Sequence, residues 1–191
     1  RIVGFACDVA DPDSVWALFK SIKGQLGRLD ILVNNAGITR DGLFGKMTLE
    51  QWKKVIDVNL TSTFRLSRAA LKVMVRRRAG RIVNITSVAG FQPQGSSIAY
   101  AVSKAGLNHL TKCMAVALAP DILVNGVAPG LMEGTSMTER LTAEHVKRAT
   151  ANSLLGKAAS KEDIAAQVVV MCQTDTMTGQ TAVIDAGRVF H

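Results

Sequence analysis

Residues 87–106 read SVAGFQPQGSSIAYAVSKAG, and this stretch decides what we expect of the whole chain. Tyr100 and Lys104 are spaced so that, in a helix, their side chains lie one turn apart on the same face. The preceding run at residues 81–86, RIVNIT, is typical of a buried strand that delivers Ser87 to the same place. A phenol, an ammonium group and a hydroxyl group are therefore predicted to converge.

These three groups suit acid–base chemistry on a carbonyl. A tyrosine, with an ordinary pKa of about 10, exchanges protons poorly at neutral pH unless a cation stabilises its phenolate. Lys104 is the obvious cation, and Ser87 can hold the carbonyl oxygen. The Tyr-x-x-x-Lys pair alone is equally compatible with a solvated surface pair. The rest of the sequence must decide between the two interpretations.

Length and composition indicate one globular domain. The chain has 191 residues, 48% hydrophobic and 20% charged, which is enough for a core. Its three cysteines, Cys7, Cys113 and Cys172, lack the spacing of a metal site or a disulfide framework, so we expect no metal and a reducing cytoplasm. No apolar run reaches the roughly 18 residues of a membrane span, and no signal-peptide pattern opens the chain. We therefore expect a soluble cytoplasmic protein without a membrane partner.

The charge balance is basic, with a formal net charge of +8. Aromatic residues make up only 5% of the chain, and the basic residues are dispersed apart from residues 76–78. This distribution argues against nucleic-acid binding. A basic surface is instead compatible with an acidic or phosphorylated small partner.

Strands and helices are predicted to alternate along the chain. Asp11-Pro12 is a helix start, Thr48 to Gln51 form a capping box, and Pro120 ends a helix. Strands are expected at residues 2–6, 29–33, 81–86, 122–128 and 180–184, and helices at 12–23, 48–80, 97–119 and 160–172, with a short one after Thr142. Such alternation predicts a parallel sheet covered on both faces.

Several motifs together resemble the short-chain dehydrogenase/reductase family. They are, in order, Asn34-Asn35-Ala36-Gly37, Asn59, Ser87, Tyr100-x-x-x-Lys104 and Pro129-Gly130. The segments GITRDGLFGKMT and GRIVNITSVAG are most similar to those of the β-ketoacyl carrier-protein reductases and acetoacetyl-CoA reductases. The resemblance implies a Rossmann-like, doubly wound α/β fold and NAD(P)H-dependent reduction of a β-ketoacyl thioester.

The resemblance also implies catalytic roles. Tyr100 is the expected general acid for the ketone oxygen, and Lys104 is expected to lower the pKa of Tyr100 and to bind the nicotinamide ribose. Ser87 is expected to hydrogen-bond the substrate oxygen. Asn59 is expected to anchor a water that links Lys104 to solvent.

A second group of positions matches cofactor contacts of the family. Asp8 and Val9 match positions that meet the adenine, although Asp8 can equally cap the turn before Asp11. The remaining expected contacts are Asn35, Ala36 and Gly37 along the cofactor, and Pro129, Gly130 and Met132 beside the nicotinamide. NADPH is the cofactor expected from the family, with NADH as the alternative.

The family's glycine-rich turn, Thr-Gly-x-x-x-Gly-x-Gly, which cradles the cofactor pyrophosphate, has no match in this chain. The chain begins at what corresponds to the third strand, so residues 1–191 correspond to a single, N-terminally incomplete reductase domain. In the order 3-2-1-4-5-6, the missing strands lie between the strands at 2–6 and 29–33. Either the sequence is incomplete, or the first strand moves into the vacant place and forms a reduced five-stranded sheet.

Partners follow from the same resemblance. The family implies a homotetramer in which the two long helices pair across two-fold axes. Arg78 is a candidate contact for an acidic acyl carrier protein, whereas Asp121, an acid where many such reductases carry a base, argues against that docking. Residues 76–78 can equally stabilise the end of a helix dipole. The alternatives are a reductase of another carbonyl or alcohol, and a catalytically inactive subunit or binding module.

Overall fold

A computed structural model describes residues 2–74, 78–93, 97–135, 138 and 142–190. The described residues form one parallel sheet in the order β1-β2-β3-β4. Its strands are β1 (Ile31–Asn34), β2 (Gly80–Ile85), β3 (Ile122–Pro129) and β4 (Thr181–Ile184). The α-helices are α1 (Pro12–Leu26), α2 (Leu49–Ile56), α3 (Ser62–Met74), α4 (Ile98–Leu118), α5 (Ala143–Ala151) and α6 (Lys161–Gln173).

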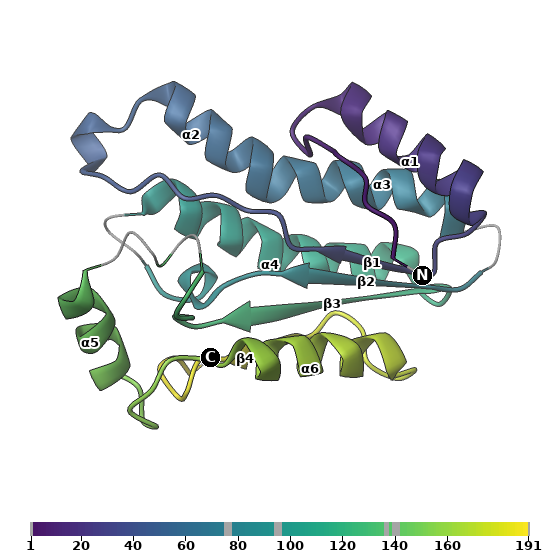
Figure 1. The fold of residues 1–191 in the computed structure, drawn as a ribbon. Coiled ribbons are helices and arrows are strands. Elements are labelled where there is room, and N and C mark those ends of the chain that lie inside the picture. Colours follow the sequence, from purple (N-terminus) through teal and green to yellow (C-terminus); the bar gives the residue numbers. More distant parts are fainter. Residues whose placement is uncertain (1, 75–77, 94–96, 136–137, 139–141, 191) are drawn as a thin grey trace.

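Helices cover both faces of the sheet, as the alternation of the sequence predicts. Figure 1 shows α1, α2, α3 and α4 on one side and α6 on the other. Successive side chains of β2 point to opposite faces of the sheet, because side chains alternate in direction along a strand. Ile82 packs with Met74 and Val124 in the first core, whereas Val83 packs with Met171 in the second. The parallel α/β architecture expected from the sequence is confirmed.

The long helix predicted at residues 48–80 is interrupted in its middle by an irregular turn. Its start is the predicted capping box, in which Gln51 N donates to Thr48 Oγ1 at 3.1 Å and Thr48 N donates to Gln51 Oε1 at 3.0 Å. Between α2 and α3, η2 (Asp57–Thr61) is π-helical. A π-helical turn often marks a functional site. Here it places Asn59, which is fully buried, against the neighbouring helix.

The prediction of a strand at residues 2–6 is wrong, because this segment pairs with no strand of the sheet. A strand needs a hydrogen-bonded neighbour. The chain instead continues over the helical side, where Cys7 and Val9, which follow the segment, pack against the core. Arg65 Nη1 donates to the carbonyl oxygens of Val9 at 2.9 Å and Ala10 at 3.1 Å. The sheet of the described residues therefore has four strands, and the five-stranded alternative is not formed.

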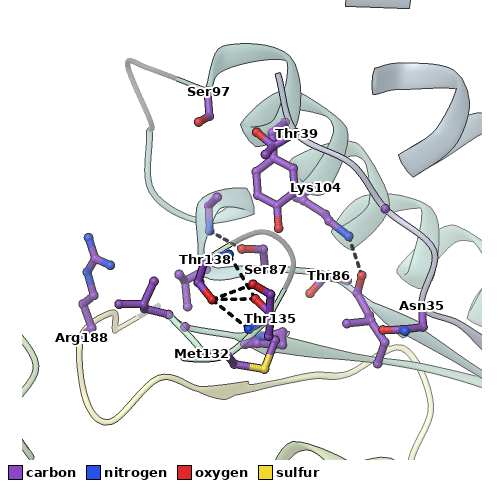
Figure 2. Close-up of a pocket in the computed structure, with 18 of the residues that line it drawn as sticks. Asn35, Thr39, Thr86, Ser87, Ser97, Lys104, Met132, Thr135, Thr138 and Arg188 are labelled. Carbon is purple, nitrogen blue, oxygen red and sulfur yellow. Dashed lines mark hydrogen bonds between the residues drawn. The ribbon is translucent and has the colours of Figure 1, made fainter. Parts of the chain in front are cut away.

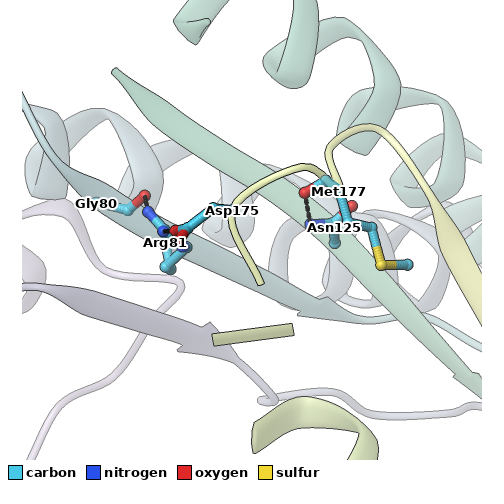
Figure 3. A network of polar contacts seen from close by, with 5 residues as sticks. All are labelled: Gly80, Arg81, Asn125, Asp175 and Met177. Atoms are coloured by element: carbon cyan, nitrogen blue, oxygen red, sulfur yellow. Dashed lines mark hydrogen bonds and ion pairs between the residues drawn. The ribbon is translucent and has the colours of Figure 1, made fainter. Parts of the chain in front are cut away.

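The connection from α6 to β4 is fastened to the sheet by polar contacts (Figure 3). Arg81, near the start of β2, donates from Nη2 to Asp175 Oδ1 at 2.5 Å and from Nη1 to Gly80 O at 3.1 Å. Asn125 Nδ2, in β3, donates to Met177 O at 2.7 Å. These contacts set the position of β4, which leads directly into the C-terminal tail.

Among the described residues, no helix is long and apolar enough to cross a membrane.

Candidate active site

A cleft of about 280 Å³ opens at the carboxyl ends of the strands. Parallel α/β sheets place their ligand sites at this edge. The cleft takes lining residues from the loop after β1, the end of β2 and its following turn, α4, and the segment after β3. The residues that line it include Asn35, Gly37, Thr39, Asp41, Ser87, Ser97, Tyr100, Lys104, Pro129, Gly130, Met132, Thr135, Thr138 and Arg188.

Ser87, Tyr100 and Lys104 meet in this cleft. β2 ends just before Ser87, and α4 carries Tyr100 and Lys104 on one face. Ala89 N donates to Ser87 Oγ at 3.2 Å, and the same hydroxyl group hydrogen-bonds Tyr100. Lys104 Nζ lies 5.6 Å from the ring centroid of Tyr100. The structure therefore brings together the three groups that the sequence analysis singled out.

Lys104 is the buried cation of the site. Its side chain is 3% exposed, and Nζ donates to Ile85 O at 2.7 Å (Figure 2). Burial lowers the pKa of Lys104 from 10.5 to about 8, because desolvation penalises the charged form. The ammonium group is therefore held mainly charged at neutral pH at an energetic cost to the fold.

The pKa of Tyr100 is raised in this structure. Burial is the main cause, the hydrogen bond to Ser87 acts in the opposite direction, and the charge of Asp41 adds to the rise. Desolvation of the phenolate therefore outweighs any effect that lowers this pKa, and the expected lowering by Lys104 stays a prediction. A raised pKa keeps Tyr100 protonated at neutral pH, which is the form that a proton donor requires.

Asn59 lies beside the cleft rather than in its wall. Its Oδ1 accepts from Ile38 N at 2.8 Å, and its Nδ2 donates to Ile38 O at 2.9 Å and to Ser103 Oγ at 3.0 Å. These bonds tie the loop after β1 to α4, next to Lys104. In this structure the side chain of Asn59 positions the elements that form the cleft.

The residues expected to contact a cofactor divide into two groups. Asn35, Gly37, Pro129, Gly130 and Met132 line the cleft, and Figure 2 shows Asn35 near Lys104. The other three, Asp8, Val9 and Ala36, do not line it.

Asp8 forms the local turn that the sequence analysis left open as an alternative. Its Oδ1 accepts from Ala10 N at 2.9 Å, and its carbonyl oxygen accepts from Asp11 N at 3.1 Å. Val9 lies on the same segment, and its carbonyl oxygen accepts from Arg65. The adenine contacts implied by the resemblance are thus not part of this cleft.

Several polar residues of the cleft were not predicted as site residues from the sequence. Asp41 accepts hydrogen bonds from Thr39 Oγ1 at 2.6 Å and from Ser97 Oγ. Thr135 and Thr138 bond each other through their hydroxyl groups at 2.9 Å. Arg188 enters from the C-terminal tail. These residues occupy loops, where no periodic pattern signals which side chains face a site.

The cleft fits the nicotinamide end of a dinucleotide. An ammonium group has three N–H donors, and one of those on Lys104 is used by Ile85 O. The remaining donors suit the vicinal hydroxyl groups of a ribose, and Asn35 and Gly37 line the same cleft. Within the described ranges, no cluster of His, Cys, Asp and Glu suits a metal ion, and the three cysteines are free.

Comparison with known proteins identifies the family. The profile described as short chain dehydrogenase matches residues 1–146. The chain belongs to the short-chain dehydrogenase family. Its members are oxidoreductases that depend on a nicotinamide cofactor. The chain is accordingly an NAD(P)-dependent short-chain dehydrogenase/reductase.

Similar proteins include 3-oxoacyl-(acyl-carrier-protein) reductases. The chain is 40% identical to that of Vibrio cholerae and 38% identical to that of Escherichia coli, in each case over 96% of this chain and 76% of the relative. The reductase of a Synechocystis strain is 39% identical over 98% of this chain and 76% of the relative. A crystal structure described as "a putative gluconate dehydrogenase" from Agrobacterium tumefaciens is 31% identical with a TM-score of 0.90, covering 95% of this chain and 73% of that one.

Proposed function

We propose that the protein reduces a β-ketoacyl thioester, of the 3-oxoacyl-carrier-protein or acetoacetyl-CoA type, to the 3-hydroxyacyl form. The observation that carries the proposal is that Ser87, Tyr100 and Lys104 line one cleft, with Ser87 and Lys104 buried. The similarity to 3-oxoacyl-(acyl-carrier-protein) reductases supports this substrate class. The reaction is a reduction step of fatty acid biosynthesis or of a related thioester pathway.

The proposed mechanism assigns the proton transfer to Tyr100. The cofactor, when bound, supplies the hydride. Ser87 Oγ accepts from Ala89 N and hydrogen-bonds Tyr100, and its O–H hydrogen is proposed to turn to the substrate carbonyl oxygen when the substrate enters beside Tyr100. Tyr100 then gives its phenolic proton to that oxygen as the carbonyl becomes an alcohol. Because the pKa of Tyr100 is raised by burial, the proton is present on the enzyme before the reaction begins.

The charge of Lys104 supports this step. Transfer of the proton leaves a phenolate on Tyr100, and a buried ammonium group nearby stabilises that anion in a low-dielectric surrounding. Asn59 is proposed as a positioning residue, because it fixes the loop after β1 against α4. The water link from Lys104 to solvent through Asn59 is retained as part of the same proposal.

NADPH is proposed as the preferred cofactor. Lys104, Asn35 and Gly37 are proposed to hold its ribose, and Pro129, Gly130 and Met132 its nicotinamide. The net charge of +8 favours a cofactor with an additional phosphate by long-range attraction. Comparing the rates with NADPH and NADH at equal concentration tests this preference.

Acyl carrier protein is the proposed carrier, and the protein is proposed to act as a homotetramer in the cytoplasm. Arg78 is highly exposed, although its Nε lies 3.7 Å from Asp121 Oδ2, so that a docking carrier must compete with this weak pair. Residues 76 and 77 of the basic cluster lie outside the described residues. Exposed apolar side chains on α3 and α4, including Phe64 and Val116, are compatible with helix pairing between subunits.

The second candidate is oxidation of a hydroxy acid. The structural match to a protein described as a gluconate dehydrogenase favours it, because the two folds superpose over nearly the whole chain. Both candidates use the same acid–base residues and differ only in the group that the outer cleft accepts.

The proposed function is tested by following NADPH absorbance with acetoacetyl-CoA, acetoacetyl carrier protein and, in the oxidative direction, gluconate with NADP. We expect consumption of NADPH with the two thioesters. Turnover of gluconate alone would select the second candidate. A folded protein that binds NADPH but turns over none of the three would overturn both.

A further inference from the structure

Arg188 is a cation in the cleft that the mechanism above does not use. It lies in the C-terminal tail, far from the catalytic residues in sequence, yet it lines the same cleft. Figure 2 shows Arg188 on the side of the cleft opposite Lys104 and Asn35. The side with Lys104 and Asn35 is the one that fits the cofactor ribose. Arg188 therefore faces the end of the cleft that remains for the substrate.

The backbone that carries Arg188 is held in place by a buried carboxylate. Asp185, 7% exposed, accepts from Gly187 N through Oδ1 at 2.9 Å and from Val189 N through Oδ2 at 2.7 Å. Val189 is buried, and Leu154 N and Leu155 N donate to the carbonyl oxygens of Gly187 and Ala186. The residues on both sides of Arg188 are thus fixed, whereas its side chain is only half-buried.

The charges around Arg188 leave it available for a ligand. The charged side chains that line the cleft are Asp41, Lys104 and Arg188. Asp41 is occupied by the hydroxyl groups of Thr39 and Ser97, and Lys104 is bonded to Ile85 O. Across the part of the chain that the structure describes, no hydrogen bond or ion pair involves the guanidinium group of Arg188. A half-buried guanidinium group of this kind suits bidentate binding of a carboxylate or a phosphate.

We propose that Arg188 determines substrate specificity by binding an anionic group that the substrate carries beyond its reacting carbonyl. The inference rests on the proposed thioester reduction and adds the chemical class of the group recognised. The anion has two possible sources, namely a carboxylate at the far end of the acyl chain and the phosphate of the pantetheine arm. Because Arg188 lies apart from the proton donor, it contributes to binding and leaves the proton-transfer step unchanged.

The experiment compares four thioesters that differ in one group at a time. The neutral reference is the N-acetylcysteamine thioester of 3-oxohexanoate, and its partner is the corresponding mono-thioester of 3-oxoadipate, which adds a terminal carboxylate. The second pair is 3-oxohexanoyl-pantetheine and 3-oxohexanoyl-4′-phosphopantetheine, which differ only in the phosphate. Each is assayed with the wild-type chain, with Arg188→Met, which keeps the length but removes the charge, and with Arg188→Lys.

The control variant is Arg28→Met. Arg28 precedes β1 at the opposite end of the sheet and forms an exposed pair with Asp30 at 2.6 Å. This variant loses one positive charge from the surface, so it reports any effect of net charge alone. Circular dichroism and NADPH binding verify that each variant is folded with an intact cofactor site.

We expect Arg188→Met to lower kcat/KM by about tenfold or more for one anionic substrate, because charge-assisted bonds are worth more than neutral ones. The lower kcat/KM should come from a higher KM with kcat little changed, and the difference from the wild type should become smaller at high salt. Arg188→Lys should partly restore kcat/KM. A loss with the 3-oxoadipyl thioester identifies the carboxylate, and a loss with the phosphopantetheine thioester identifies the phosphate.

Two results overturn parts of the account separately. Turnover of these thioesters that Arg188→Met leaves unchanged, or lowers equally for neutral and anionic members, refutes the role of Arg188 but not thioester reduction. Failure of the wild-type chain to reduce any of them refutes the proposed function and, with it, the inference that depends on it.

Discussion

Replacement of Lys104 by methionine tests the electrostatic cost of the site. Burial lowers the pKa of Lys104 from 10.5 to about 8, so the native state releases this proton at lower pH than the unfolded chain does. Between these two pKa values the unfolded state binds more protons, and the free energy of unfolding therefore rises with pH. Below a pH of about 8, Lys104 is charged in the native state, and the free-energy cost of burying this charge is at its maximum.

The magnitude follows from the size of the shift. The difference between 10.5 and about 8, at about 1.4 kcal/mol per pKa unit, gives a cost of about 3 kcal/mol at neutral pH. Loss of the bond to Ile85 O offsets roughly 1 to 2 kcal/mol of this in the variant. We therefore expect Lys104→Met to be more stable than the wild type by roughly 1 to 2 kcal/mol at neutral pH, and inactive.

The assay is urea unfolding of both proteins from pH 7 to pH 10, monitored by circular dichroism. The wild-type free energy of unfolding should rise relative to that of Lys104→Met by roughly 2 to 3 kcal/mol over this range. Taking the difference between the two proteins removes the contribution of the titrating groups that lie away from Lys104. Tyr100 lies beside Lys104, but its raised pKa places its titration at the upper end of this pH range or above it. A difference that is flat or falls with pH would refute the assignment of Lys104 as a buried, destabilising cation.

Two further predictions concern other residues around the cleft. Asp41→Asn should lower the pKa of Tyr100, because it removes a negative charge that raises this pKa. The alcohol-oxidation rate should then reach half its maximum at lower pH. Asp57→Asn, which changes an exposed side chain at the start of η2, should leave the pH profile in place. Ala186 has a φ of 58°, a left-handed conformation that glycine adopts without strain, so Ala186→Gly should raise the free energy of unfolding by about 0.5 to 1 kcal/mol. The same change at Ala182 in β4 should lower the free energy of unfolding by about as much. In urea unfolding, a decrease for Ala186→Gly or an increase for Ala182→Gly would contradict the backbone assignment.

The regular elements were largely predictable from local sequence signals. The capping box at Thr48, the Asp11 cap and the apolar runs of β2 and β3 each specify their element through interactions between near neighbours. The segment at 2–6 has the composition of a strand but lacks a neighbour that would pair with it, and composition alone does not report that. The π-helical turn at η2 depends on contacts of Asn59 with a loop and a helix that are distant in sequence.

The site was predictable where a motif fixes the geometry. Tyr100 and Lys104 share a helix face, and Ser87 follows a strand, so their meeting could be predicted from spacing. Asp41 and Arg188 reach the cleft through loops, and no periodicity marks their direction. The direction in which the pKa of Tyr100 shifts also depends on burial, which is a property of the assembled fold.

The central claim is that Tyr100 donates the proton in a thioester reduction. The most direct measurement is single-turnover oxidation of NADPH with acetoacetyl-CoA by the wild-type chain and by Tyr100→Phe, with NADPH binding measured for both. We expect Tyr100→Phe to bind NADPH normally and to react more slowly by about 10² to 10⁴-fold, the usual contribution of a general acid. A rate within a fewfold of the wild type would contradict the account.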